Sequence, residues 1–230
     1  MKKRGKIILE SNYQVEYMTN GVPKVFEFYL FVNPLGQKCY VCECELQKTL
    51  TKISTNVDIH VICFHNQQIV SDFMKQLNIP SSDLTSRNYI YQSVYLASLA
   101  YKAATMQGKK KGRRFLMRMQ EEIDGYLERF SDQFILDLAE EVGLDMMTFK
   151  EDLESDYARD LVFQDLQIAK EMAVEGTPTL VMFEHRLGEK GLLLKENITA
   201  SNIISHLDEL VRYDFINQSN KPNLVLLQNK

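Results

Sequence analysis

The sequence predicts a split α/β domain that is interrupted by a block of helices. An aromatic, β-rich run at 26–32 is followed by a helical pattern and then by a second strand-like run at 57–64. From about residue 87 to residue 174 the apolar residues recur with helical spacing, and no proline interrupts them. Strand-like runs return only at 179–183 and 191–195, before a last amphipathic helix. The expected order is therefore βαβ, a helical block and ββα.

The first segment, residues 1–80, is expected to form the βαβ unit. Its aromatic run is stopped by an Asn-Pro pair, as at the end of a strand. A helical pattern follows from Gln37 to about Ser54. The next run, VDIHVICF, is apolar almost throughout, as in a strand that is covered on both faces. Two strands joined by a crossover helix pair in parallel.

The second segment, residues 81–175, is expected to be an all-helical insertion. Gly143 is a plausible stop for one of its helices, and Gly176 for the last one. Asp145 and Ser155 are suited to cap the two helices that follow them. The apolar residues that define the helices lie within 91–102, 115–130, 134–142, 149–153 and 161–172.

The third segment, residues 176–230, is expected to complete the α/β domain. It contains the two returning strands and an amphipathic helix from about Thr199 to Tyr213. The tail at 217–230 is polar apart from LVLL. We expect a poorly ordered end, with a docking segment and an added edge strand as the alternatives.

The composition is that of an ordinary globular protein. The chain has 230 residues, 45% apolar and 25% charged, and a net charge of −4, which argues against a generic nucleic-acid binder. The stretch 120–175 carries 17 acidic and 4 basic side chains, either as solvated helix faces or as an acidic docking surface. No apolar run approaches the ~20 residues of a membrane span, and the first residues lack the apolar core of a signal peptide. We therefore expect a cytoplasmic protein with reduced thiols.

Two motifs flank the expected helical insertion. The first, NPLGQKCYVCEC at 33–44, lies where the first strand meets its helix. The second, Gly176-Thr177-Pro178-Thr179, directly precedes the returning strand. Thioredoxin-like folds keep a cis X-Pro bond at the position that this proline occupies. Together the motifs resemble the DsbA-like branch of the thioredoxin superfamily, which implies a thioredoxin-like fold with the insertion inside it.

Within that branch the chain resembles the YjbH/SpxH-type adaptors of Gram-positive bacteria. The residues that carry this resemblance are SLAYKAA at 98–104, QGKKKGRRFL at 107–116, GLD at 143–145 and FKEDL at 149–153. The resemblance implies a cytoplasmic adaptor that binds the transcription regulator Spx and promotes its degradation by the ClpXP protease. From the residues themselves we expect no cofactor, and no membrane or nucleic-acid partner.

The redox motif of the branch is incomplete. Dithiol oxidoreductases of this type place the first cysteine of a Cys-x-x-Cys at the helix N-terminus, where its pKa is lowered. In that register the first position is Gly36 and the second is Cys39, so the nucleophile is absent. Cys39 and Cys42 form a Cys-x-x-Cys one helical turn further on. These two thiols are either ordinary buried side chains or a redox pair, and a cytoplasmic thiol–disulfide oxidoreductase or isomerase that uses Cys39 or both is the alternative function.

A zinc site is the other chemistry that these cysteines allow. Cys39, Cys42 and Cys44 offer three thiolates, and a Cys63-x-His65 pair follows the second strand. However, Cys44 lies about 200° around a helix from Cys42, so one continuous helix does not direct all three sulfurs at one ion. We expect no metal.

A basic segment falls between two of the expected helices. The segment carries five cations and is expected to form a glycine-flanked loop. This loop is either solvated or in contact with an acidic surface on a partner. No aromatic platform accompanies the run, which argues against nucleic acid. The five residues are Lys109, Lys110, Lys111, Arg113 and Arg114.

Overall fold

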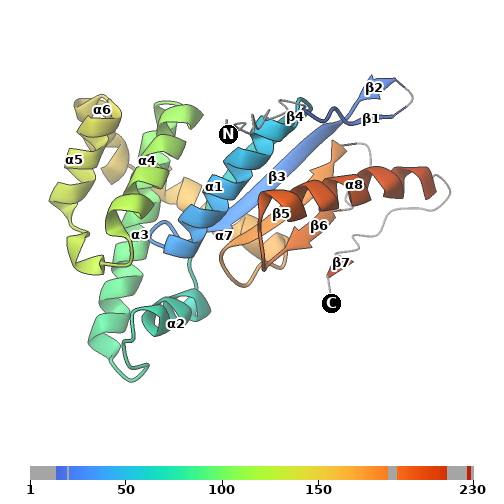
Figure 1. The fold of residues 1–230 in the computed structure, drawn as a ribbon. Helices are drawn as coiled ribbons and strands as arrows, with labels where there is room; N and C mark the ends of the chain where they lie inside the picture. The colour runs from blue at the N-terminus through green and yellow to red at the C-terminus, as the bar shows by residue number, and fades with distance from the viewer. Residues whose placement is uncertain (1–13, 20, 186–190, 217–226, 229–230) are drawn as a thin grey trace, which may run out of the picture.

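The computed structural model describes residues 14–19, 21–185, 191–216 and 227–228, and in them one mixed sheet forms the centre of the molecule (Figure 1). A separate antiparallel pair, β1 and β2, precedes it. The sheet has five strands in the order β4-β3-β5-β6-β7. The strands are β1 (Met18–Thr19), β2 (Val22–Pro23), β3 (Val25–Val32), β4 (Asn56–Cys63), β5 (Thr179–Glu184), β6 (Gly191–Leu194) and β7 (Leu227–Gln228).

The register of the sheet confirms the expected βαβ unit. β3 and β4 pair in parallel from Val25 opposite Asn56 to Val32 opposite Cys63. The central strand β3 also pairs antiparallel with β5, which lies beyond the helical block in sequence. The chain therefore leaves the sheet after β4 and returns to the other side of β3, which leaves β4 at the edge.

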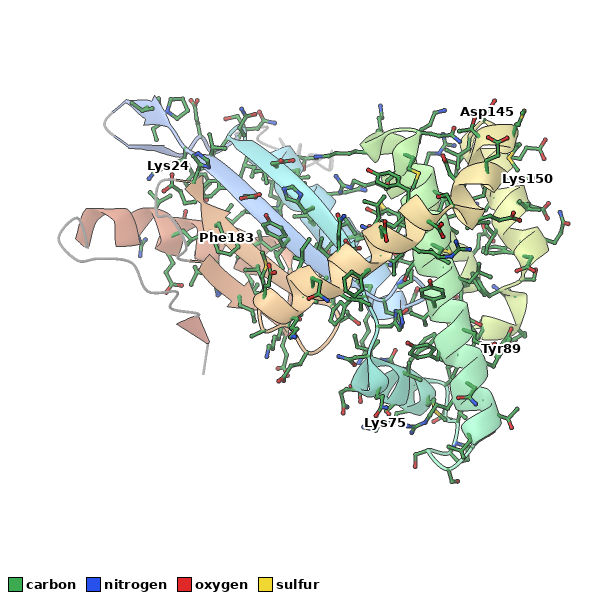
Figure 2. The ribbon with its side chains drawn as sticks, turned by 180° about the vertical axis from the view of Figure 1, so that it is seen from behind. Lys24, Lys75, Tyr89, Asp145, Lys150 and Phe183 are labelled. Atoms are coloured by element: carbon green, nitrogen blue, oxygen red, sulfur yellow. The ribbon has the colours of Figure 1, made fainter. Side chains whose placement is uncertain are left out.

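Helices cover both faces of the sheet. α1 and α8 lie on one face, and α7 crosses the other, as Figure 2 shows from behind. α3, α4, α5 and α6 stand beside the sheet, and α2 lies beside the lower end of α3 in Figure 1. The helices are α1 (Gln37–Lys52), α2 (Gln67–Gln76), α3 (Leu84–Met106), α4 (Lys109–Ile123), α5 (Asp132–Val142), α6 (Met146–Glu154), α7 (Asp156–Glu171) and α8 (Ala200–Ile216), with a 3₁₀ turn at Leu127–Arg129.

Local capping chemistry sets several helix ends as predicted. Asp145 Oδ1 accepts a hydrogen bond from the Thr148 backbone N–H at 2.8 Å, and Ser155 Oγ accepts one from Ala158 at 3.0 Å. Gly143 ends α5 with a left-handed φ of 77°. These ends are fixed by groups within a few residues of each other, which is why the sequence predicts them correctly.

Two other predicted helix ends are wrong. The helix expected through Phe130 stops at Ile123, because Asp124 and Gly125 adopt left-handed backbone with φ of 42° and 80°. The last helix of the insertion stops before Gly176, because Ala173 takes a φ of 52°.

The basic segment was expected to be a loop, and that prediction is also wrong. Lys109, Lys110, Lys111, Arg113 and Arg114 all lie in the first turns of α4. Gly108 alone makes the turn from α3, with a φ of 121°. Gly112 is inside the helix, where an added Cβ would lie 2.9 Å from the Thr105 Cα, so this glycine allows α3 and α4 to pack closely. Lysine and arginine are good helix formers, so nothing opposes helix between the two glycines.

Some elements were not expected from the sequence. The β1–β2 pair is one, and α2 is another. β7 pairs in parallel with β6 through Leu227 and Gln228, as in the edge-strand alternative for the tail. The rest of that tail, 217–226 and 229–230, lies outside the described residues. Within the described part of the chain, the helices are all too short or too polar to span a bilayer.

Candidate functional site

The first candidate site lies where β3 passes into α1. Asn33 builds the turn, because its Oδ1 accepts a hydrogen bond from the Leu35 N–H at 3.0 Å and its carbonyl accepts one from the Gly36 N–H at 3.0 Å. This turn makes Gly36 the N-cap of α1, with no side chain to cap the helix. Cys39 therefore lies in the first turn of α1, and Cys42 lies in the second.

The thiol of Cys39 is buried rather than presented to solvent. Its side chain is 2% exposed, and its Sγ accepts a hydrogen bond from the Asn33 N–H at 3.2 Å. Thr177 makes a further hydrogen bond with the sulfur. Both hydrogen bonds favour the thiolate, yet burial outweighs them and raises the pKa of Cys39 to about 12. Cys39 is therefore a neutral thiol near pH 7.

The other nearby cysteines are buried too. Burial raises the pKa of Cys42 above its usual range, and it does the same for Cys63 on β4. All four cysteines are free thiols, and Cys44 is the most exposed of them. No group of three or more histidine, cysteine or acidic side chains is placed to hold a metal ion within the ranges that the structure covers.

The returning loop lies against the same thiol. The Thr177–Pro178 peptide bond is cis, and Thr179 Oγ1 donates a hydrogen bond to the Gly176 carbonyl at 2.8 Å. Gly36, Cys39 and Thr177 line one hollow of about 20 Å³. That volume has room for about one water molecule. The fold thus brings the predicted Gly36, Cys39 and Thr177 together around a sulfur that is almost fully buried.

α2 closes this hollow, and it is not among the helices expected from the sequence. Ile69, Asp72, Phe73 and Gln76 of α2 line the hollow opposite Cys39. The signals were present in the sequence: Asn66 caps the helix through Oδ1 and the Ile69 N–H at 2.7 Å, and the buried apolar residues have helical spacing.

A buried carboxyl group lies on the inner side of α1. Glu43 is fully buried, and burial raises its pKa to about 8, against opposing effects of Gln120 and Arg113. Gln120 of α4 also donates a hydrogen bond through Nε2 to the Asn33 carbonyl at 3.3 Å. Glu43 is therefore mostly protonated at pH 7. Through Gln120, α4 contacts the turn that carries the first site.

A second candidate site is a groove of about 590 Å³ between α1, β4 and α4. We call it the basic groove. It gathers Lys109, Lys110, Arg113 and Arg114 from the predicted basic segment. Lys111 is not part of it, because its ammonium group donates a hydrogen bond to the Gly143 carbonyl at 2.9 Å. The remaining lining residues are Tyr40, Gln47, Val57, Asp58, Ile59, Met117, Arg118 and Glu121.

Comparison with known proteins shows which families this chain is similar to. A family model described as thioredoxin matches residues 29–205. The ClpXP adapter protein SpxH of Staphylococcus epidermidis is 31% identical over 185 residues, which cover 80% of this chain and 64% of that protein. SpxH of Bacillus subtilis is 30% identical, over 79% of this chain and 68% of that protein. The chain thus spans just under two thirds of the staphylococcal relatives it matches.

Solved structures show the fold. BdbD from Bacillus subtilis aligns with a TM-score of 0.58 at 15% identity, over 81% of this chain and 88% of that one. The cytosolic disulfide reductase DsbM from Pseudomonas aeruginosa aligns with a TM-score of 0.54 at 16% identity, over 81% and 99%. These matches confirm the DsbA-like fold that the sequence predicts.

Proposed function

Because the chain belongs to the thioredoxin family and, within it, to the family of the ClpXP adapter protein SpxH, we propose that it is an adapter in regulated proteolysis. It binds an Spx-type transcription regulator in the cytoplasm and presents it to the ClpXP protease. The protease is the one that the relatives are named for, and the regulator is the partner that the family resemblance implies.

The observation that carries this proposal is the closed thiol site. Glycine replaces the nucleophile at position 36, and the remaining Cys39 is buried with a pKa of about 12. With that pKa almost none of the thiol is ionised at pH 7, and thiol–disulfide exchange requires the thiolate. A buried, protonated thiol of this kind does not carry out exchange, which fits an adapter better than an oxidoreductase.

The same observation weighs against an oxidoreductase. The DsbA-like neighbours share the fold with this chain, and a shared fold does not imply a shared reaction. An insulin-reduction assay with dithiothreitol separates the two functions. We expect the rate to equal the uncatalysed background. Turnover that disappears in Cys39→Ser would contradict the adapter function.

The direct test is reconstituted degradation. Purified ClpXP and an Spx-type regulator are incubated with and without this protein, and the remaining regulator is followed over time. We expect saturable acceleration that Cys39→Ser retains, and an unchanged rate for an unrelated ClpXP substrate. No acceleration of the regulator's degradation would refute the proposal.

A further inference from the structure

The edge strand β4 is covered along only one of its halves. At its carboxyl end the Cys63 N–H donates a hydrogen bond to Asp165 of α7 at 2.9 Å, and the Tyr101 hydroxyl donates one to the Val61 carbonyl at 3.5 Å. The residues of this half are buried, whereas Asn56–His60 are half-buried or exposed. The helical insertion therefore buries this half of the strand and binds two of its outward backbone groups.

The other half presents unpaired backbone groups. In a parallel ladder the backbone groups of alternate residues point away from the neighbouring strand. Since Val61 and Cys63 point outward, Val57 and Ile59 do so as well. No hydrogen bond joins their outward N–H and C=O groups to another described residue outside the sheet. Such an open edge is a template for an added strand.

The basic groove lies beside this open half. Val57, Asp58 and Ile59 are part of its lining, and α4 forms the facing wall (Figure 2). The basic residues of α4 that line the groove lie at 109, 110, 113, 114 and 118, a spacing that places them on one side of the helix, whereas Lys111 lies outside the groove. Tyr40 and Met117 add apolar surface. The groove thus combines apolar contacts, an open strand edge and positive charge.

Most of this positive charge is not neutralised by the protein itself. Lys109 pairs with Asp58 at 3.4 Å, and Arg118 is held by Glu121, Glu122 and Glu141. For Lys110, Arg113 and Arg114 the part of the chain that the structure describes offers no carboxylate within ion-pair distance. Lys110 and Arg114 are also exposed.

We propose that the basic groove binds an extended acidic segment of a client protein, which adds as a strand along Asn56–His60. Its backbone pairs with Val57 and Ile59, and its acidic side chains meet Lys110, Arg113 and Arg114. The volume of about 590 Å³ is within the range of ligand sites. The inference rests on the proposed function only for the identity of the protein that carries the segment.

The charge of the basic groove favours a separate protein, rather than either end of this chain, as its occupant. Residues 1–13 carry four basic side chains and one acidic, and residues 217–230 carry two lysines and no acid. Neither end complements a basic groove. Nucleic acid is the other polyanion, but the open strand edge supplies donors and acceptors that match a polypeptide backbone.

A peptide assay tests the groove without any regulator. A fluorescein-labelled decapeptide of alternating glutamate and threonine is titrated with the full chain, and binding is followed by anisotropy. We expect the paired variant Lys110→Glu/Arg114→Glu to weaken binding about tenfold or more. The control is Lys111→Glu/Lys150→Glu, which makes the same charge change outside the groove, since Lys150 lies far from β4 on α6 (Figure 2). Its affinity should change by less than about twofold.

Three outcomes of this assay overturn the proposal. They are no binding by the wild-type chain, equal losses in the groove and control pairs, or tighter binding of a thymidine decanucleotide than of the peptide. A glutamine-threonine decapeptide should bind more weakly than the acidic one, and equal affinity would also contradict the charge argument. Melting temperatures of all variants confirm that they are folded.

A second pair of variants tests the strand edge. Ile59→Pro removes the outward N–H but leaves the bonds to β3, because proline is tolerated at an outward edge position. Ile59→Ala removes a similar amount of packing and keeps the N–H. We expect the proline variant to weaken peptide binding about tenfold and the alanine variant to stay within about threefold. Equal binding by both would show that no strand is added.

Repeating the titrations with an Spx-type regulator separates this inference from the proposed function. Loss of regulator binding in Lys110→Glu/Arg114→Glu but not in the control pair supports both. A wild-type chain that binds the acidic peptide but not the regulator refutes the adapter function and leaves the groove standing. Full regulator binding by the groove pair refutes the groove as the client site.

Discussion

The ammonium group of Lys102 lies 2.6 Å from the carboxylate of Asp165, and their side chains are only 11% and 4% exposed. Lys102 belongs to α3 and Asp165 to α7, and the same carboxylate accepts the Cys63 N–H of β4. Burial raises the pKa of Asp165 to about 6, although Lys102 opposes the shift. The desolvation of such a pair consumes most of its attraction, so it specifies how the insertion meets the sheet rather than adding much stability.

This pair predicts an asymmetric response to mutation. Lys102→Met leaves a buried carboxylate without its cation and should cost about 3–5 kcal/mol of unfolding free energy at pH 7. The double variant Lys102→Met/Asp165→Leu removes both charges and should cost less, although the Cys63 N–H then loses its acceptor. Urea denaturation at pH 7 measures both. A double variant that is less stable than Lys102→Met would show that the pair itself is strongly stabilising.

Glu43 makes stability depend on pH. Its pKa is raised from an ordinary 4.5 to about 8 in the folded protein, so the folded state holds a proton that the unfolded state releases. The stabilising contribution is fully present below about pH 4.5 and is lost as pH rises through about 8. Glu43→Gln keeps a neutral side chain of the same shape and should remove this loss.

Melting curves of the wild type and Glu43→Gln between pH 5 and pH 9 test this. We expect nearly equal melting temperatures at the acid end and a more stable variant at the alkaline end, by a few kcal/mol. Glu45→Gln is the control, because the Glu45 carboxylate on the same helix pairs with Lys48 and accepts the Ala200 N–H, and its lowered pKa keeps it ionised throughout this pH range. A constant difference between wild type and Glu43→Gln across the range would contradict a buried proton on Glu43.

The sequence predicts those strands and helix caps that depend on residues close to one another in the chain. The strands β3, β4 and β5 and the caps Asp145 and Ser155 follow from periodicity and local hydrogen bonds. The sequence predicts a loop for the basic segment because Gly108 precedes it and Gly112 lies within it, but only Gly108 makes a turn. Its assembly with β4 into the groove is a tertiary contact that no local pattern shows. The division at 1–80, 81–175 and 176–230 remains a prediction.

The closed thiol site also depends on tertiary contacts. Gly36 in the nucleophile position is readable from the motif, but the burial of Cys39 comes from α2 and from the Thr177 loop. The sequence alone therefore left a redox pair open as an alternative. Burial, rather than distance from the helix N-terminus, is what keeps Cys39 protonated.

Client binding should not depend on the thiols. We expect Cys39→Ser, Cys42→Ser and Cys44→Ser to bind an Spx-type regulator within about threefold of wild type under reducing conditions. The reason is that Cys39 and Cys42 are buried neutral thiols and none of the three lines the basic groove. Calorimetric titration measures the affinities. A tenfold loss in a folded variant would mean that a thiol takes part in binding.

Restoring a cysteine at position 36 should recreate a dithiol. A Cβ built on Gly36 would lie 3.3 Å from the Cys39 Sγ, so a cysteine sulfur there is within reach of a disulfide. The backbone poses no obstacle, since φ of Gly36 is −90°. The same Cβ would lie 3.2 Å from Asn33 Cβ, so a modest stability loss is expected. Gly36→Ser shares that loss without the sulfur and is the matched control.

We expect oxidised glutathione to convert Gly36→Cys to an intramolecular disulfide, seen as a mass loss of two hydrogens and mapped to Cys39 by peptide analysis. Because position 36 is the N-cap of α1, the new thiol receives the helix dipole that Cys39 cannot use while buried. Insulin reduction by Gly36→Cys should therefore exceed that of the wild type and of Gly36→Ser. A variant that stays fully reduced, or one whose disulfide joins other cysteines, would show that the turn at Asn33 no longer holds the geometry of a dithiol site.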